Sequence, residues 1–146
     1  MSLARPVSLV RLDADMLAVI AAQRLCFAAT VTPEGRPNLS PKGTVRVWDE
    51  HHIFFCDIAS PGTRANLERN EWIELNVVDT LSRRGYRFLG RGSVHRGDEI
   101  FREAVGRITR EEGAEYPVES VILIAVERGS TTTSGACFSI ASASAS

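Results

Sequence analysis

Residues 36–70 read RPNLSPKGTVRVWDEHHIFFCDIASPGTRANLERN, and this stretch decides the fold that we expect. We interpret segments 37–47 and 52–57 as two strands, because a polar turn at 48–51 separates them. A short helix is expected over about 63–69, since Pro61 suits the first turn of a helix. The stretch therefore predicts a strand hairpin that ends in a polar loop and a helix.

The loop that begins this helix has the composition of an anion site. Ser60, Thr63 and Arg64 offer donors where unpaired backbone N–H groups and the helix dipole favour a phosphate. Lys42 is the chain's one lysine, and it adds a charge nearby if the two strands pair. Plain helix capping by Ser60 or Thr63 and a solvated Lys42 remain the alternatives. The G-x-x-x-x-G-K-[ST] spacing of a triphosphate loop is absent.

Composition and charge exclude several classes of protein. A chain of 146 residues predicts one domain with a real core, and its net charge of −1 disfavours a nucleic-acid binder. No apolar run approaches a membrane span, and no secretory signal pattern is present, so we expect a cytoplasmic protein. Cys26, Cys56 and Cys137 form no C-x-x-C pair, which suits reduced, buried thiols.

The segments on either side of 36–70 predict further strands and helices. A strand over 25–31 and a type I turn at 32–35 lead into the strand that begins at Pro37, which makes three consecutive strands an antiparallel meander. Asp13 and Asp98 are expected to cap helices, because apolar residues recur at helical spacing after each. Further strands are expected over 72–79, 84–96 and 118–126. In 84–96 Tyr86 and Phe88 alternate with Arg87 and Arg91, so one face is buried.

These segments together predict a mainly β protein. About six strands, mostly neighbours in sequence, and three helices favour a small antiparallel barrel whose ends are closed by the helices. Residues 1–128 are expected to form the domain. Residues 129–146 are nearly all Gly, Ser, Thr and Ala, so we expect a flexible tail.

The sequence indicates no catalytic or metal-binding side chains. His51 and His52 are adjacent, and neighbouring residues on an extended chain point opposite ways, so they cannot easily share a metal and we interpret them as exposed turn residues. His95 stands alone, and no set of Ser, His and Asp is indicated. No nucleophile elbow or zinc-protease helix is present.

Four segments in order resemble a known family. They are residues 29–43 (ATVTPEGRPNLSPKG), 60–67 (SPGTRANL), 77–79 (VVD) and 84–90 (RGYRFLG). Together they resemble the pyridoxamine 5′-phosphate oxidase-like FMN-binding split-barrel family over about residues 25–105. The resemblance implies a six-stranded antiparallel split β-barrel and a homodimer with FMN at the subunit interface.

The resemblance also implies roles for particular residues. Ser40, Pro41, Lys42 and Gly43 would line the isoalloxazine ring, and Thr44 or Arg46 would reach toward the ribityl-phosphate. Ser60, Thr63 and Arg64 would hold the phosphate, which agrees with the anion site inferred from their chemistry, and Asn66 would secure the loop. Arg84, Tyr86 and Arg87 would approach the flavin from the partner chain.

The resemblance implies an FMN-dependent oxidoreductase whose flavin takes electrons from a reduced nicotinamide or a small organic substrate. The protein then supplies binding, orientation and electrostatics, so no catalytic side chain is required. The oxidase's C-terminal segment of Arg, Pro and Trp is replaced here by the Ser/Ala tail, so oxidation of vitamin B6 is not expected. The alternatives are a flavin-binding carrier or sensor with little turnover, and the same barrel holding the deazaflavin F420 or haem.

Overall fold

The computed structural model describes residues 8–133, which form a seven-stranded antiparallel sheet with three helices. No helix in this part of the chain is long and apolar enough to cross a membrane. The helices are α1 (Ala14–Gln23), α2 (Pro61–Arg69) and α3 (Glu99–Glu112). The strands are β1 (Cys26–Val31), β2 (Pro37–Lys42), β3 (Arg46–Asp49), β4 (His52–Asp57), β5 (Trp72–Asp79), β6 (Arg84–His95) and β7 (Ser120–Thr133).

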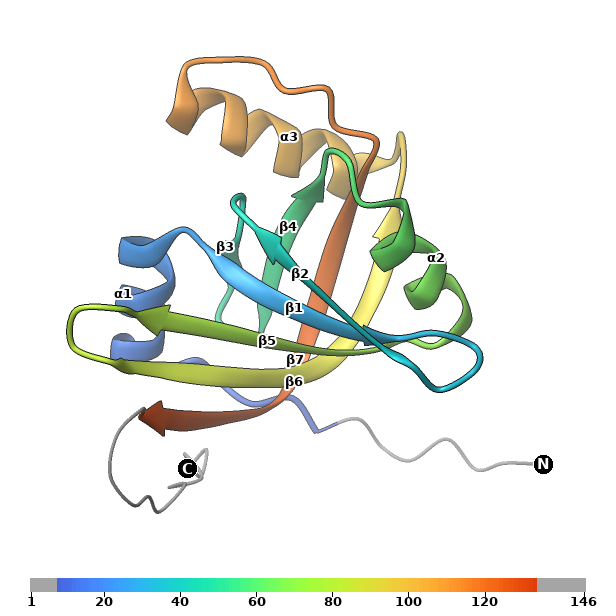
Figure 1. Cartoon of the computed structure of the whole chain (residues 1–146). Helices are drawn as coiled ribbons and strands as arrows, with labels where there is room; N and C mark the ends of the chain where they lie inside the picture. The colour runs from blue at the N-terminus through green and yellow to red at the C-terminus, as the bar shows by residue number, and fades with distance from the viewer. Residues whose placement is uncertain (1–7, 134–146) are drawn as a thin grey trace.

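The strands curl into a split barrel (Figure 1). Their order in the sheet is β2-β1-β5-β6-β7-β4-β3, so β6 and β7 join two halves. As Figure 1 shows, α1 lies at one end of the barrel, α2 lies at the other, and α3 covers β4 and β7 from outside. The expected mainly β split barrel with three helices is therefore confirmed, with seven strands in place of six.

The seventh strand exists because the expected strand 37–47 is two strands. The chain turns at Gly43 and Thr44, and β2 and β3 then lie at opposite ends of the sheet order. The hydroxyl of Thr44 donates to the Cys56 carbonyl (3.1 Å) and accepts from the Cys56 N–H (2.8 Å). The Thr44 side chain thus makes the two hydrogen bonds to the backbone of β4 that the backbone of a neighbouring strand would otherwise make. The expected three-strand meander is wrong, although the β1–β2 and β3–β4 hairpins form as expected.

The side chains of β4 alternate between two apolar clusters. Ile53 and Phe55 point into the barrel, whereas Phe54 and Cys56 lie under α3 with Ala104 and Ile108 of that helix. Both faces of β4 are therefore buried, which explains its almost unbroken apolar sequence. As expected, Asp13 and Asp98 cap α1 and α3, since each carboxylate accepts a backbone N–H three residues on.

The last strand is longer than the apolar run 118–126. β7 continues to Thr133 and pairs with β6 as far as Arg84. Residues 129–133 therefore belong to the sheet and not to a tail, because the long β6 provides a ladder for these small residues. The rest of the expected tail, 134–146, lies outside the described residues, as does Cys137.

Candidate functional site

A buried lysine is the most unusual side chain in the described part of the chain. Lys42, at the end of β2, is only 3% exposed, and its Nζ has no hydrogen-bond partner among residues 8–133. The ammonium lies 5.5 Å from the ring centroid of Phe55. Burial lowers the pKa of Lys42, and the negative charge of Asp57 opposes this change. A buried cation without a partner is costly, so this position is suited to an anionic or strongly polar ligand.

Lys42 lines a cavity of about 300 Å³ at the split between β2 and β4. Five of the residues predicted from the sequence line it: Pro41, Lys42, Gly43, Thr44 and Ser60. Its other walls come from β4 and the loop after it, and from the far end of α3 and the loop that follows α3: Cys56, Ile58, Ala59, Glu112 and Tyr116. The structure therefore brings together the end of β2 and the start of α2, which are far apart in sequence.

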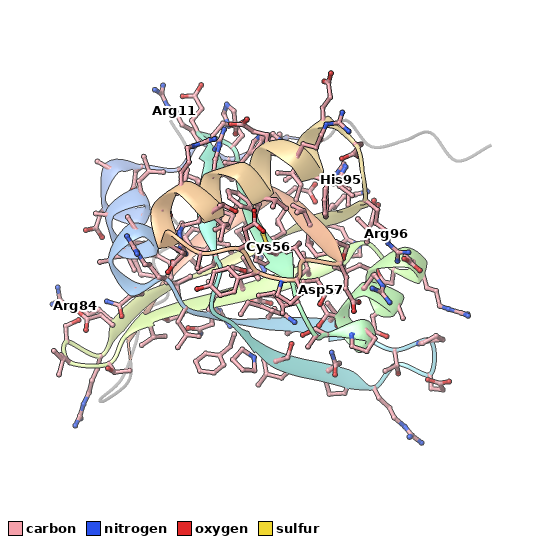
Figure 2. All side chains as sticks on the ribbon, turned by 90° about the horizontal axis from the view of Figure 1, so that it is seen from above. Arg11, Cys56, Asp57, Arg84, His95 and Arg96 are labelled. Atoms are coloured by element: carbon pink, nitrogen blue, oxygen red, sulfur yellow. The ribbon has the colours of Figure 1, made fainter. Side chains whose placement is uncertain are left out.

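Asp57 organises the loop beside this cavity. Its buried carboxylate accepts the backbone N–H of Ser60 at 2.7 Å and the hydroxyl of Ser120 at 3.3 Å. Figure 2 shows Asp57 and Cys56 in the middle of the molecule. The side-chain hydroxyl of Ser60 makes no capping bond to α2, and Ser60 lines the cavity.

The predicted phosphate residues Thr63 and Arg64 lie behind this loop. Thr63 is buried, and its hydroxyl lies 3.2 Å from that of Ser40. Arg64 donates to Glu119 Oε2 at 2.9 Å and lies 3.8 Å from Asp57 Oδ2. The guanidinium is thus near the start of α2 but already paired with acids, so a phosphate there competes with Glu119.

Two other predicted residues have partners that fix the scaffold. Arg46 is buried and donates to Glu111 and Glu112, each at 2.6 Å, which ties β3 to the end of α3. Asn66 donates its side-chain amide to Thr30 at 3.0 Å and so holds α2 against β1. Both positions support the cavity walls without lining the cavity.

Arg84, Tyr86 and Arg87 lie elsewhere in the chain. Figure 2 shows Arg84 at one end of the molecule, away from Asp57. Arg84 and Tyr86 line a second cavity of about 220 Å³ with Asp15, and the Tyr86 hydroxyl donates to the Asp15 carboxylate. Burial and this acid raise the pKa of Tyr86 to about 12. Within one chain, these three residues do not contribute to the cavity at Lys42.

An apolar face covers the outer side of β1 and β2. Phe27, Val31 and Leu39 are 43%, 36% and 69% exposed. They lie on one side of the sheet, since Ala29 pairs with Leu39 and Phe27 pairs with Pro41. Contiguous apolar exposure of this kind is typical of an interaction surface.

The sequence model of the family described as Pyridoxamine 5'-phosphate oxidase matches residues 12–133. The chain belongs to the pyridoxamine 5′-phosphate oxidase family. No curated protein matches its sequence significantly. The resemblance that four short segments indicated is thereby confirmed, and it extends over the barrel from before α1 to the end of β7.

Several solved structures share this fold. HupZ from Group A Streptococcus is 31% identical, with a TM-score of 0.76, covering 87% of this chain and 98% of that one. A putative pyridoxamine 5′-phosphate oxidase from Lactobacillus delbrueckii is 23% identical (TM-score 0.68; 82% and 93% covered). An FMN-binding protein from Syntrophomonas wolfei is 14% identical (TM-score 0.67; 84% and 86% covered). The last two show similarity of fold alone.

Sequence reasoning missed the walls that long-range contacts supply. Glu112 at the end of α3 and Tyr116 in the loop after it line the cavity, although they lie more than fifty residues after Ser60. The contact between Arg46 and the end of α3 could have been predicted. An arginine buried in a strand needs an acidic partner, and the adjacent acids Glu111 and Glu112 are candidates for it. Burial of Asp57 could also have been predicted, because this acid directly follows the apolar residues of a strand.

Proposed function

We propose that this chain binds FMN in the cavity at Lys42 and acts as an FMN-dependent oxidoreductase. The observation that carries the proposal is the buried Nζ of Lys42, which has no partner among the described residues and lines a cavity next to the start of α2. A flavin presents carbonyl oxygens and ring nitrogens that accept hydrogen bonds, and it gains negative charge on reduction. Lys42 supplies the donor and the positive charge that such a ring requires.

The remaining residues of the cavity divide by their chemistry. Pro41 and Gly43 place backbone at the ring, and Gly43 has no neighbour within 4 Å of an added Cβ, so the site is open there. Ser60 and the first turn of α2 face the phosphate, with Arg64 supplying the charge once Glu119 is displaced. Thr44 and Arg46 hold the walls through Cys56 and the end of α3.

A second copy of the chain completes the site in this proposal. The cavity of about 300 Å³ is at the lower limit of small-molecule pockets, which measure about 300–1,000 Å³. The exposed apolar side chains Phe27, Val31 and Leu39 give a homodimer its contact surface. The partner's Arg84, Tyr86 and Arg87 then approach the open side of the flavin.

Bound FMN would supply the redox chemistry by accepting a hydride and returning electrons to an acceptor. The chain's own part is positioning and electrostatics. Lys42 stabilises negative charge on the ring, because a preorganised cation in a buried site requires little reorganisation when that charge develops. We place electron donation with a reduced nicotinamide or a small organic substrate.

The absorption spectrum of the purified protein, followed by addition of NADPH or NADH without oxygen, tests this function. We expect a flavin spectrum that is bleached by the nicotinamide and restored by air. A flavin spectrum that no donor bleaches would instead support a carrier or sensor. A deazaflavin or haem spectrum, or a colourless protein that does not bind added FMN, would overturn FMN as the cofactor.

The phosphate contact is tested separately by comparing FMN with riboflavin. Arg64→Gln should weaken FMN binding about tenfold or more, because a charge-assisted hydrogen bond contributes about 1.5–3 kcal/mol, and should leave riboflavin binding unchanged. Glu119→Gln should strengthen FMN binding, since it frees the Arg64 guanidinium. Equal effects on both ligands would show that Arg64 acts on the fold and not on the phosphate.

A further inference from the structure

Three side chains at the end of β6 form a hydrogen-bonded chain that the flavin proposal does not use. Ser93 Oγ lies 2.7 Å from His95 Nε2, and His95 Nδ1 lies 2.8 Å from Asp98 Oδ2. Residues 93 and 95 are two apart on a strand and so share a face. Asp98 follows at the start of α3. His95, expected from the sequence to stand alone, therefore has two side-chain partners in the structure, which corrects that expectation.

The protonation pattern of this chain of contacts follows from Asp98. Its Oδ1 accepts the backbone N–H of Phe101 at 2.9 Å, and this bond, followed by the contact with His95, lowers the pKa of Asp98. An ionised carboxylate only accepts, so His95 Nδ1 donates to it. In the neutral tautomer that results, Nε2 accepts and the Ser93 hydroxyl donates to it at 2.7 Å, in preference to the longer 3.4 Å contact that the same hydroxyl makes with the Leu123 carbonyl. This is the arrangement in which a histidine removes a proton from a serine nucleophile.

Asp98 is held in place by the fold. Because it is also the N-cap of α3, one carboxylate oxygen is fixed to the helix while the other orients the imidazole. His95 is largely buried, with 16% of its side chain exposed. Figure 2 shows His95 beside the start of α3, where β6 ends. The imidazole is thus oriented by a rigid helix terminus rather than by a loop.

Ser93 lines a cavity of about 670 Å³ between β6 and the end of α2. This cavity is open to solvent, and its lining combines the apolar Leu67, Trp72 and Val94 with polar and charged residues from the end of α2 and the turn after it, Glu68, Arg69, Asn70 and Glu71. It shares no lining residue with the cavity at Lys42. A reaction here would therefore be independent of flavin.

A donor for a developing oxyanion is available from the strand edge. The N–H of Gly92 points to the β5 side, where it donates to the Glu71 carbonyl at 2.7 Å. Alternation places the N–H of Val94 on that same edge. β5 begins at Trp72, which pairs with Arg91 of β6. From Gly92 to His95, β6 therefore has a paired strand only on its β7 side. The N–H of Val94, the residue after the serine, is left beside the cavity.

We propose that Ser93, His95 and Asp98 form a second site that hydrolyses small carboxylic esters. Ser93 Oγ attacks the ester carbonyl carbon as its proton passes to His95 Nε2, and the Val94 N–H stabilises the oxyanion. The C–O bond to the alcohol breaks, and His95 returns the proton to that alcohol. Water, activated by His95, then releases the acid and restores Ser93. Asp98 is a positioning residue.

A fluorophosphonate probe and p-nitrophenyl acetate test the site. The probe should label Ser93, forming an O–P bond with loss of fluoride, as located by peptide mass spectrometry. Ser93→Ala should abolish labelling and ester turnover. His95→Asn should slow labelling on the order of 100-fold, which is the usual contribution of general acid–base catalysis. Labelling that occurs at other serines, or that His95→Asn leaves unchanged, would overturn the proposal.

Two variants separate the chemistry from the fold. Asp98→Asn keeps a good helix cap, so it should lower kcat with KM and thermal stability nearly unchanged. His52→Asn is the matched control, because His52 Nδ1 lies 2.7 Å from Asp49 in a similar acid–imidazole pair that, among the described residues, makes no hydrogen bond to a serine. It should leave turnover unchanged. Equal loss in His52→Asn and His95→Asn would mean catalysis by surface imidazole, which contradicts the site.

Discussion

Lys42 concentrates the energetic cost of the candidate flavin site in one side chain. An ammonium buried among Cys26, Phe55 and Asp57 loses its hydration. The cation–π contact with Phe55 and the charge of Asp57 compensate only part of the lost hydration free energy. Such a residue destabilises the empty protein. It also prepares the cavity for a ligand that offers acceptors. Stability and binding therefore oppose each other at this position.

Replacing Lys42 separates these two effects. Lys42→Met keeps the aliphatic length and removes the charge, so we expect the ligand-free protein to resist urea better. FMN affinity should fall at least about tenfold, the loss expected for a hydrogen bond from a charged donor. Arg36→Met, at the exposed β1–β2 turn, is the control and should change neither quantity. Lower stability together with unchanged FMN affinity would assign Lys42 a purely structural role.

The same lysine predicts a pH dependence of stability. Its folded-state pKa lies below the ordinary value of 10.5, so the unfolded chain binds more protons between the two values. The stability difference between Lys42→Met and the natural chain should therefore shrink as the pH rises toward 10.5. Burial raises the pKa of Cys26 to about 12 and that of Cys56 to about 11. Both proteins should lose stability above pH 9 for that reason. The contribution of Cys56 cancels in the difference measured by urea titration, whereas Lys42→Met also removes the charge that lowers the pKa of Cys26.

At the scale of elements, glycines permit close packing in β6. Gly90 lies where the β6–β7 register shifts, and an added Cβ would collide with the Ala125 carbonyl and lie 2.9 Å from Ile124 Cγ2. Both neighbours belong to the buried, rigid β7. Gly106 is different, because in α3 an added Cβ meets only the end of the flexible Arg110 side chain at 3.2 Å.

These two glycines should respond in opposite ways to alanine. Gly90→Ala should lower the free energy of unfolding by about 3 kcal/mol, the cost of overpacking a rigid core. Gly106→Ala should raise it by about 0.8–1 kcal/mol, the difference in helix propensity. Urea denaturation measures both. Similar effects of the two substitutions would mean that the register shift at Gly90 does not depend on a missing side chain.

At the scale of the whole molecule, the apolar face of β1 and β2 predicts the oligomer. Leu39→Glu places a charge in the centre of that face, so we expect a monomer by light scattering and loss of FMN, because the partner's residues leave the site. Arg110→Glu, exposed on α3, introduces the same side chain elsewhere and should remain a dimer that retains FMN. A natural chain that is already monomeric, or a Leu39→Glu dimer, would contradict the proposed assembly.

Residues close together in sequence predicted the local features of the fold, whereas two features that depend on contacts between distant segments were not predicted. Local signals were sufficient for Asp13 and Asp98 as caps, for the hairpin turns and for the alternation of Tyr86 and Phe88 with Arg87. The break at Gly43 was not predictable locally, because the Thr44 hydroxyl bonds to Cys56, twelve residues away. Burial of Lys42 was likewise invisible, since Cys26, its partner across the sheet, belongs to another strand. The break at Gly43 and the burial of Lys42 thus both depend on contacts between distant segments.

β7 has a consequence for how the protein is made. Asp57, at the end of β4, pairs with Ser120 at the start of β7. During synthesis β4 therefore has no β7 partner until more than sixty further residues have emerged from the ribosome. In the hairpins β1–β2 and β5–β6, by contrast, both strands are available to pair as soon as their own residues have been synthesised. Until Thr133 follows, β4 and β6 expose hydrogen-bonding edges to other nascent chains. Premature termination before Ser120 should therefore yield insoluble protein rather than a smaller barrel.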